Sequence, residues 1–408
     1  MGFTIRQDCP QCGAAIELDE TDHILHCPYC DVKSYLFTPH YFRYLLPHKA
    51  GDKALYYAPY LRFKGTAYFC AGNGVGHRIV DITHKGVGLA GIPISLGVRP
   101  QAMKMHFVTP QAEGTFLRFT LKAADILARA AKLTSSMVSG ELHHRAFIGE
   151  TLSLIYLPLY VQDDRLYDAV LNRPLVAAPN GTDAMGEHTK MNPRWEIKFI
   201  PTLCPHCGWD LEGEKDSVVL ACKNCDALWE ASGGKLDRVA CSTVPAVGEE
   251  ALFLPFWRIS AKSTGLQLSS YADFLRVTAQ PRVVQEEWES RAMHYWTPAF
   301  KIRPKVFLRL SKQLTVTQAS FDAGERIPKK YRFPVTLPGE EALQGLKIIL
   351  AGSTLKKNQV FPFLSSTTFQ VREKRLVYLP FHDMGHDYVQ DHLGVSVNKN
   401  SLAYGRNL

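Results

Sequence analysis

Eight of the ten cysteines in this 408-residue chain fall into two copies of one pattern. Each copy has two Cys-x-x-Cys pairs separated by fourteen residues, at Cys9, Cys12, Cys27 and Cys30 and again at Cys204, Cys207, Cys222 and Cys225. A Cys-x-x-Cys turn directs two thiolates to one tetrahedral centre, and a hairpin of this length brings a second turn back to face the first. The spacing therefore predicts two tandem ribbons, each holding one metal ion in four thiolates.

Zinc is the metal expected at both sites, because closed four-cysteine sites are the commonest use of this spacing. Iron has the same ligand set in a rubredoxin-like site and stays open as an alternative. Disulfides are not expected, since the first fifteen residues contain no apolar segment of an export signal, which indicates a reducing cytoplasm. A thioredoxin-type redox pair would instead place one Cys-x-x-Cys at the start of a helix.

Three proline-containing motifs follow each ribbon in the same order. They are Tyr57-Ala-Pro59-Tyr60, Arg99-Pro100 and Tyr156-Leu-Pro158-Leu159 in the first half, and Phe253-Leu-Pro255-Phe256, Arg303-Pro304 and Tyr378-Leu-Pro380-Phe381 in the second. The first proline comes 29 residues after Cys30 and 30 after Cys225. This recurrence predicts an internal duplication, with loop insertions in the second copy.

The expected organisation is ribbon 1 at 1–35, a first body at 36–195, ribbon 2 at 196–236 and a second body at 237–408, with the repeat boundary in the polar segment 180–193. Aromatic and branched residues predict strands at Leu55–Phe63, Ala67–Cys70, Arg78–Thr83, Leu152–Val161 and Lys305–Leu310. Helical periodicity predicts helices at Phe116–Leu133 and Pro338–Leu350. The expected fold class is α+β, mainly antiparallel β, with each ribbon followed by a β-rich body that has one main helix.

Charge is divided unevenly between the ribbons and the bodies. The chain carries a formal net charge of +8, yet residues 1–35 and residues 200–230 each contain six acidic and two basic side chains. The bodies are therefore basic, most densely over 299–332. Basic side chains there form a candidate patch for an anionic partner: Lys301, Arg303, Lys305, Lys329, Lys330 and Arg332. Alternating charged and apolar residues over 305–312 are also typical of a half-buried strand.

Three further patterns could carry chemistry. The segment Gly72–Gly76 has the wrong spacing for a dinucleotide loop and precedes a strand pattern, so a hairpin turn is expected. His382 and His386 could hold an extra metal, but they fall in the closing hairpin, where polar turn residues are the simpler interpretation. Cys70 and Cys241 are expected to be structural thiols.

The order Cys-Pro-x-Cys-Gly, Leu-x-Cys-Pro-x-Cys and an aromatic-proline strand leading to Leu61-Arg62-Phe63-Lys64-Gly65 resembles that of bacterial tandem zinc-ribbon proteins of unassigned function, with ribbons of the transcription factor IIB type. The resemblance covers the ribbons and the strand after each. It implies an adaptor role, because some members carry transmembrane segments and are connected with membrane-stress or scaffold systems. This chain has no membrane-spanning segment, and it carries Asp31 and Asp226 where glycine follows the second cysteine pair.

We therefore expect a non-enzymatic zinc-binding adaptor or scaffold that acts through protein–protein contacts in the cytoplasm, and that reaches a membrane only through a membrane partner. The first alternative is nucleic-acid binding by the basic bodies, with Phe300, Phe307, Tyr331 and Phe333 as stacking partners. Against it, ribbons that bind phosphates should present lysine and arginine rather than acids. The second alternative is an iron-thiolate electron carrier.

Overall fold

The computed structural model describes residues 2–72, 74–121, 140–177, 188–189, 195–246, 250–318 and 320–406. The protein is mainly β, with 43% strand and 17% helix, and most of its sheets are antiparallel. The predicted β-dominated, antiparallel class is therefore confirmed. Among the described helices, none is both long and apolar enough to span a lipid bilayer.

The first half of the chain contains β1 (Thr4–Asp8), β2 (Ala15–Asp19), β3 (Ile24–His26), β4 (Lys33–Phe37), β5 (Phe42–Leu45), β6 (Tyr56–Ala71), β7 (Gly74–Lys85), α1 (Arg99–Ala102), β8 (Met105–Phe107), β9 (Thr115–Leu117), β10 (Leu142–Gln162), β11 (Arg165–Asp168), β12 (Arg173–Ala177) and β13 (His188–Thr189). The second half contains β14 (Lys198–Pro201), β15 (Leu211–Glu212), β16 (Val219–Cys222), β17 (Ala227–Ser232), β18 (Lys235–Val239), β19 (Cys241–Thr243), β20 (Ala251–Thr264), α3 (Tyr271–Val277), β21 (His294–Pro298), α4 (Pro304–Thr317), α5 (Gly339–Gln344), α6 (Leu346–Ser353), α7 (Lys357–Val360), β22 (Thr368–Asp383), β23 (Asp387–Gln390), β24 (Val395–Asn398) and α8 (Lys399–Gly405). Three short 3-10 helices lie at Glu286–Trp288, Phe361–Phe363 and Asp391–Leu393.

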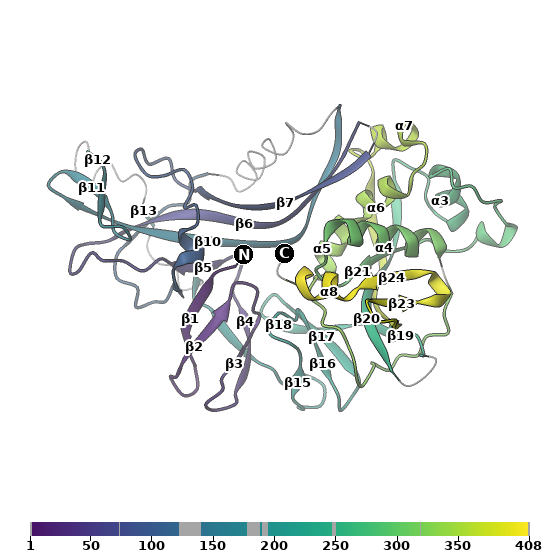
Figure 1. Cartoon of the computed structure of the whole chain (residues 1–408), viewed down its shortest axis with the longest axis horizontal. Helices are drawn as coiled ribbons and strands as arrows, with labels where there is room; N and C mark the ends of the chain where they lie inside the picture. The colour runs from purple at the N-terminus through teal and green to yellow at the C-terminus, as the bar shows by residue number, and fades with distance from the viewer. Residues whose placement is uncertain are drawn as a thin grey trace.

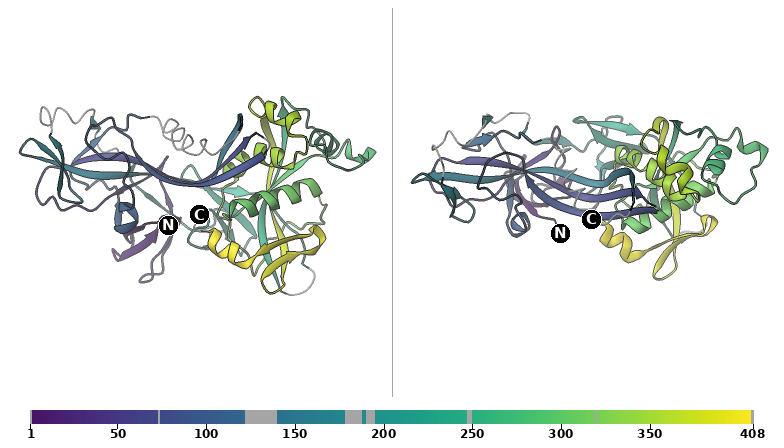
Figure 2. Two further views of the ribbon diagram at one scale, coloured as in Figure 1. Left: turned by 45° about the horizontal axis from the view of Figure 1, so that its top comes forward. Right: turned by 90° about the horizontal axis from the view of Figure 1, so that it is seen from above.

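The first half is built on three long antiparallel strands. Strand β6 pairs with β7 on one side and with β10 on the other, and the remaining strands of an eleven-stranded sheet extend from this centre within the described residues. The long strands run past the ribbons and end beside the helices of the second half (Figures 1 and 2). Gly72 and Gly74 lie at the turn between β6 and β7, so the predicted glycine hairpin is confirmed.

The far ends of these strands complete the core of the second half. Tyr68, Ala146 and Ile148 are buried there among residues of the second half's helices and strands. The ring of Tyr68 lies 5.6 Å from that of Phe307 on α4. The division of the chain into bodies at 36–195 and 237–408 stays a prediction. Residues from both ranges pack in one hydrophobic core.

The proline motifs of each half pair with one another. Pro59 on β6 lies opposite Tyr156 on β10, and Pro255 on β20 lies opposite Tyr378 on β22. The second strand of each pair also has a short parallel neighbour, β5 beside β10 and β19 beside β22. This arrangement of three strands is therefore the same in both halves.

The first proline of each half lies at a point where the segment paired with its strand is replaced by another one. The carbonyl of Pro59 accepts a hydrogen bond from the N–H of Gly86 at 2.7 Å, and the carbonyl of Pro255 accepts one from Ala299 at 3.0 Å. On this side, β6 pairs with β9 before the proline and with β7 after it. Proline cannot donate to a ladder, so a gap between two neighbours accommodates it inside a paired strand.

The predicted strands at 55–63, 67–70, 78–83 and 152–161 are confirmed as parts of β6, β7 and β10, and the predicted helix at 338–350 is confirmed as α5 and α6. The predicted strand Lys305–Leu310 is wrong, because these residues lie in α4. Pro304 occupies the first turn of α4, a position that favours helix initiation. Phe307, Leu310 and Leu314 then form its buried face.

The helix predicted at Phe116–Leu133 is wrong at its start, because Phe116 and Leu117 belong to β9. The ring of Phe116 stacks on Tyr57 of β6 at 4.8 Å, so cross-strand packing outweighs the helical periodicity there. Residues 122–133 of that prediction lie outside the described residues, as does most of the predicted boundary at 180–193.

Candidate metal centres

Each set of four cysteines converges on one point. In the first set the Sγ atoms of Cys9 and Cys30 are 3.7 Å apart, and those of Cys12 and Cys27 are 3.6 Å apart. In the second set the corresponding distances are 3.6 Å and 3.5 Å. Within each set, all four sulfur atoms lie within 4.8 Å of one another.

These distances fit a tetrahedral metal ion. Four sulfurs at about 2.3 Å from a central zinc are separated by about 3.8 Å, close to the observed spacing. A disulfide requires about 2.05 Å, and all eight cysteines are free thiols in the structure. Four thiolates complete a tetrahedral shell, so the donor set is that of a closed, structural site without a position for substrate.

Tight turns present the thiolates. The residue after the second cysteine of each pair has a left-handed backbone, with φ of 74° at Gly13, 58° at Asp31, 73° at Gly208 and 52° at Asp226. Glycine adopts this conformation freely, and aspartate is one of the few other residues that does so at modest cost. Asp31 and Asp226 therefore keep the turn that glycine makes elsewhere in the ribbons.

Hydrogen bonds from neighbouring N–H groups favour ionisation of one thiol in each set. A side-chain hydrogen bond from Asn224 and a backbone one from Trp209 lower the pKa of Cys207 to about 6. Burial opposes ionisation of Cys27, but hydrogen bonds from the backbone of Cys30 and Tyr29 outweigh it and lower the pKa of Cys27 to about 6. Thiolates are the form that binds metal.

The two ribbons are joined through their backbones. Strand β14, which leads into ribbon 2, pairs antiparallel with β4 of ribbon 1 from Lys198–Phe37 to Pro201–Ser34. The carbonyl of Lys215 accepts hydrogen bonds from the N–H groups of His23 and Ile24 at 2.7 and 2.9 Å. The ribbons therefore lie side by side below the long strands (Figure 1).

They also share one hydrophobic core. Ile24 and Tyr35 of ribbon 1 are buried against apolar residues of ribbon 2, namely Leu211, Leu220, Ala227 and Trp229 together with the buried ligands Cys204 and Cys222. Burial, together with the charge of Glu230, raises the pKa of the Tyr35 phenol well above its usual value. This contact between the ribbons is not evident from the sequence, because the cysteine pattern of each ribbon is complete by itself and does not indicate a neighbour.

Large apolar side chains remain exposed at the metal-binding turns. Tyr29, between the last two ligands of ribbon 1, is 75% exposed, and Trp209, two residues after Cys207, is 59% exposed. Leu203, next to the first ligand of ribbon 2, is 50% exposed. Exposed aromatic residues on a rigid support are typical of protein–protein contact surfaces.

The structure divides the candidate basic patch into two groups. Lys301, Arg303 and Lys305 lie at the start of α4, whereas exposed Lys329 and Lys330 lie in the segment after Ile327 together with Arg332. Arg332 lies 3.5 Å from Glu212 of ribbon 2.

Two of the predicted stacking partners, Phe300 and Phe307, are buried in the core and cannot present their faces to a base. Tyr331 is 60% exposed, and the half-buried ring of Phe333 packs edge-on against Phe300. Of the four predicted stacking partners, Tyr331 is therefore the one that is exposed, and it lies beside Lys330 and Arg332.

The other candidates stay separate from the metal centres. Among the described residues, the only clusters of His, Cys, Asp or Glu suited to a metal are the two cysteine sets, so His382 and His386 do not form a third. They lie at the β22–β23 hairpin, as predicted. Cys70 is buried and Cys241 is partly buried; burial raises the pKa of both thiols, that of Cys70 to about 12.

No protein-family model matches the chain, and no curated protein or solved structure is significantly similar to it.

Proposed function

We propose that the protein is a non-enzymatic adaptor whose two zinc ribbons form one rigid surface for a protein partner. The observation that carries this proposal is the joined pair of ribbons with exposed Tyr29 and Trp209 at their metal-binding turns. Closed four-thiolate sites support a structural role for the metal, since catalytic zinc keeps one position open.

Zinc is the proposed metal at both centres rather than iron, because closed four-cysteine ribbons are its usual sites. Thiolate ligands require reduced cysteines, so the proposed compartment is a reducing cytoplasm. The metal would supply the folding free energy of each ribbon, which is too small to bury sufficient apolar area alone.

We further propose that the two halves arose by duplication and resemble the bacterial tandem zinc-ribbon group. The support is the common hydrogen-bond pattern around the proline motifs. The carbonyl of Tyr156 accepts from the N–H of Leu46 at 3.2 Å, and the carbonyl of Tyr378 accepts from Val244 at 3.0 Å. The second copy then differs by its longer helix, α4 in place of the single turn α1.

The charge of the ribbons favours a protein over nucleic acid. Each ribbon has six acidic and two basic side chains, and four thiolates around one divalent ion add further negative charge. Phosphate binding derives most of its affinity from lysine and arginine, so an acidic ribbon surface would repel a phosphate backbone. A neutral or basic protein surface is the expected partner.

The test is affinity capture with matched surface variants. The double variant Tyr29→Ser/Trp209→Ser removes both exposed rings, and Phe363→Ser removes a ring that is 48% exposed beside α7, away from the ribbons. The proposal predicts a partner retained by the wild type and by Phe363→Ser but lost by the double variant. Retention of every partner by the double variant would contradict it.

A second measurement distinguishes the adaptor proposal from nucleic-acid binding. Binding to duplex DNA and single-stranded RNA is measured at low and physiological salt for the wild type and for Lys329→Ala/Lys330→Ala. The adaptor account predicts negligible binding at physiological salt. Tight binding that falls steeply with salt, with a smaller slope in the double variant, would favour nucleic acid instead.

A further inference from the structure

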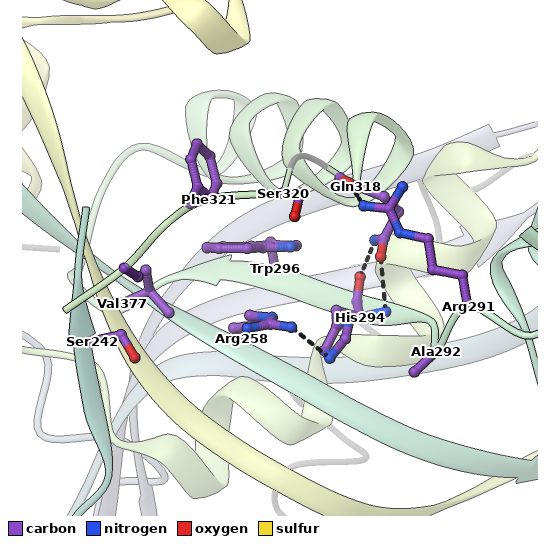
Figure 3. A pocket seen from close by; sticks show the side chains of 11 residues that line it. Ser242, Arg258, Arg291, Ala292, His294, Trp296, Gln318, Ser320, Phe321 and Val377 are labelled. Carbon is purple, nitrogen blue, oxygen red and sulfur yellow. Dashed lines mark hydrogen bonds between the residues drawn. The ribbon is translucent and has the colours of Figure 1, made fainter. Parts of the chain in front are cut away.

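A cavity of about 240 Å³ lies in the second half of the chain, and none of the cysteine ligands lines it (Figure 3). Strands β20, β21, β22 and β19 form its floor, and the end of α4 with the segment after it forms its upper wall. The residues that concern us are Arg258, Arg291, His294, Trp296, Gln318 and Phe321.

Two arginines give the cavity a positive charge. Among the described residues, neither Arg258 nor Arg291 forms an ion pair with a carboxylate; their hydrogen bonds go to a histidine ring nitrogen and a backbone carbonyl. A third arginine, Arg375, lies opposite Arg258 on β22 and pairs with the half-exposed Glu373. Burial lowers the pKa of Arg258; Glu373 opposes this shift, whereas Arg375 and Arg291 add to it.

A neutral histidine holds Arg258 in place. The Nε2 atom of His294 lies 2.9 Å from the guanidinium Nη2 of Arg258 (Figure 3). Burial and the charge of Arg258 lower the pKa of His294 to about 4, so the ring is neutral at physiological pH and its Nε2 accepts the hydrogen bond. A carboxylate in this position would cancel the charge of the arginine, whereas the imidazole orients the guanidinium and leaves the charge available.

A constrained helix end holds Arg291. Helix α4 ends at Thr317, and the residue that caps it, Gln318, has a left-handed backbone with φ of 46° and a carbonyl that accepts a hydrogen bond from Arg291. The buried side chain of Gln318 accepts from the N–H of His294 at 3.1 Å and donates to its carbonyl.

The remaining wall is aromatic and apolar. The rings of Trp296 and Phe321 meet edge to face, 6.2 Å apart, and Val377 lies below them. A volume of 240 Å³ equals that of about eight water molecules at roughly 30 Å³ each, which is room for one small ring with an anionic substituent. Arginine pairs favourably with planar oxyanions through its fork of N–H donors.

We propose that this cavity binds a small organic anion, with a phosphate or carboxylate group between Arg258 and Arg291 and a flat apolar part against Trp296 and Phe321. The two guanidiniums supply the charge, and His294 and Gln318 fix their positions. The site is independent of the ribbons, so it would add a ligand-dependent function to the second half of the chain.

Calorimetric titration of the metal-loaded protein with phenyl phosphate, benzoate, inorganic phosphate and neutral phenol tests the proposal. We expect phenyl phosphate or benzoate to bind more tightly than inorganic phosphate or phenol, since only they offer both the charge and the ring. The tighter of the two identifies the anionic group. Absence of binding of both at millimolar concentration would overturn the proposal.

Variants link the binding to this cavity. Arg258→Gln and Arg291→Gln should each weaken binding at least about tenfold, as expected for the loss of a charged hydrogen bond, while the exposed Arg326→Gln should not change it. Phe321→Ala should weaken binding of phenyl phosphate and leave inorganic phosphate unchanged, so it keeps the test decisive if an arginine variant fails to fold. Affinities unchanged in the folded cavity variants would refute the assignment.

Discussion

Replacing Glu20 by glutamine should destabilise the junction between ribbon 1 and the long strands. The Glu20 carboxylate is fully buried and binds the guanidinium of Arg62 on β6 through two hydrogen bonds, one of them 2.9 Å long. Arg62 is 2% exposed and keeps a second partner, Asp81 on β7, at 2.7 Å. The buried Lys64 lies nearby, and Glu20 opposes the lowering of its pKa by burial.

The magnitude follows from what the substitution leaves behind. Removing one partner of a buried ion pair costs about 3–5 kcal/mol, because the remaining charge is buried without compensation. Asp81 still compensates part of the Arg62 charge, so the expected loss is at the lower end, about 3 kcal/mol. The measurement is the free energy of unfolding of the metal-loaded protein in urea, for the wild type and Glu20→Gln.

The matched control removes both charges. In Glu20→Leu/Arg62→Met both buried charges are gone, and Asp81, which loses Arg62, is 29% exposed and stays in contact with water. Replacement of a buried ion pair by apolar residues is often neutral or stabilising. The double variant should therefore be more stable than Glu20→Gln. A loss below about 1 kcal/mol in Glu20→Gln, or an equal loss in both variants, would refute the assignment of the effect to buried charge.

Three further outcomes are expected. Burial and the charge of Glu341 raise the pKa of Glu150 from 4.5 to about 7, so folding favours its protonated form. The free energy of unfolding should therefore fall as the pH rises from 4.5 through 7. Urea midpoints measured over this pH range should fall less for Glu150→Gln than for the wild type. Cys222→Ser should remove one metal equivalent and also increase amide exchange at Tyr35 of ribbon 1, because the ribbons share a core; unchanged exchange there would contradict that sharing. At Asp31, with φ of 58°, glycine should preserve metal affinity in a chelator competition, whereas valine should weaken it.

The sequence predicted what depends on local spacing. The metal ligands follow from the intervals between cysteines, and the strands of the first half follow from their aromatic and branched residues. The error at Lys305–Leu310 was also local: Pro304 favours the first turn of a helix, and this signal outweighs the alternation that suggested a strand. The secondary structure of a segment was predictable where its hydrophobic periodicity and its start and turn residues indicate the same element.

Other features depend on contacts between distant segments. The pairing of β14 with β4 joins the ribbons, yet neither strand contains a motif that indicates its partner. The anion cavity likewise draws Arg258, His294 and Gln318 from two strands and a helix end, without any sequence pattern connecting them. Such sites are created by tertiary packing and become visible only in the folded chain.

Elemental analysis of the purified protein, with the visible absorption spectrum of the same sample, tests the central claim most directly. Two thiolate centres of structural zinc predict two zinc ions per chain and a colourless solution, with loss of ribbon structure when a chelator removes the metal. Iron with thiolate charge-transfer absorption, or ribbons that remain folded after all metal has been removed, would contradict the account.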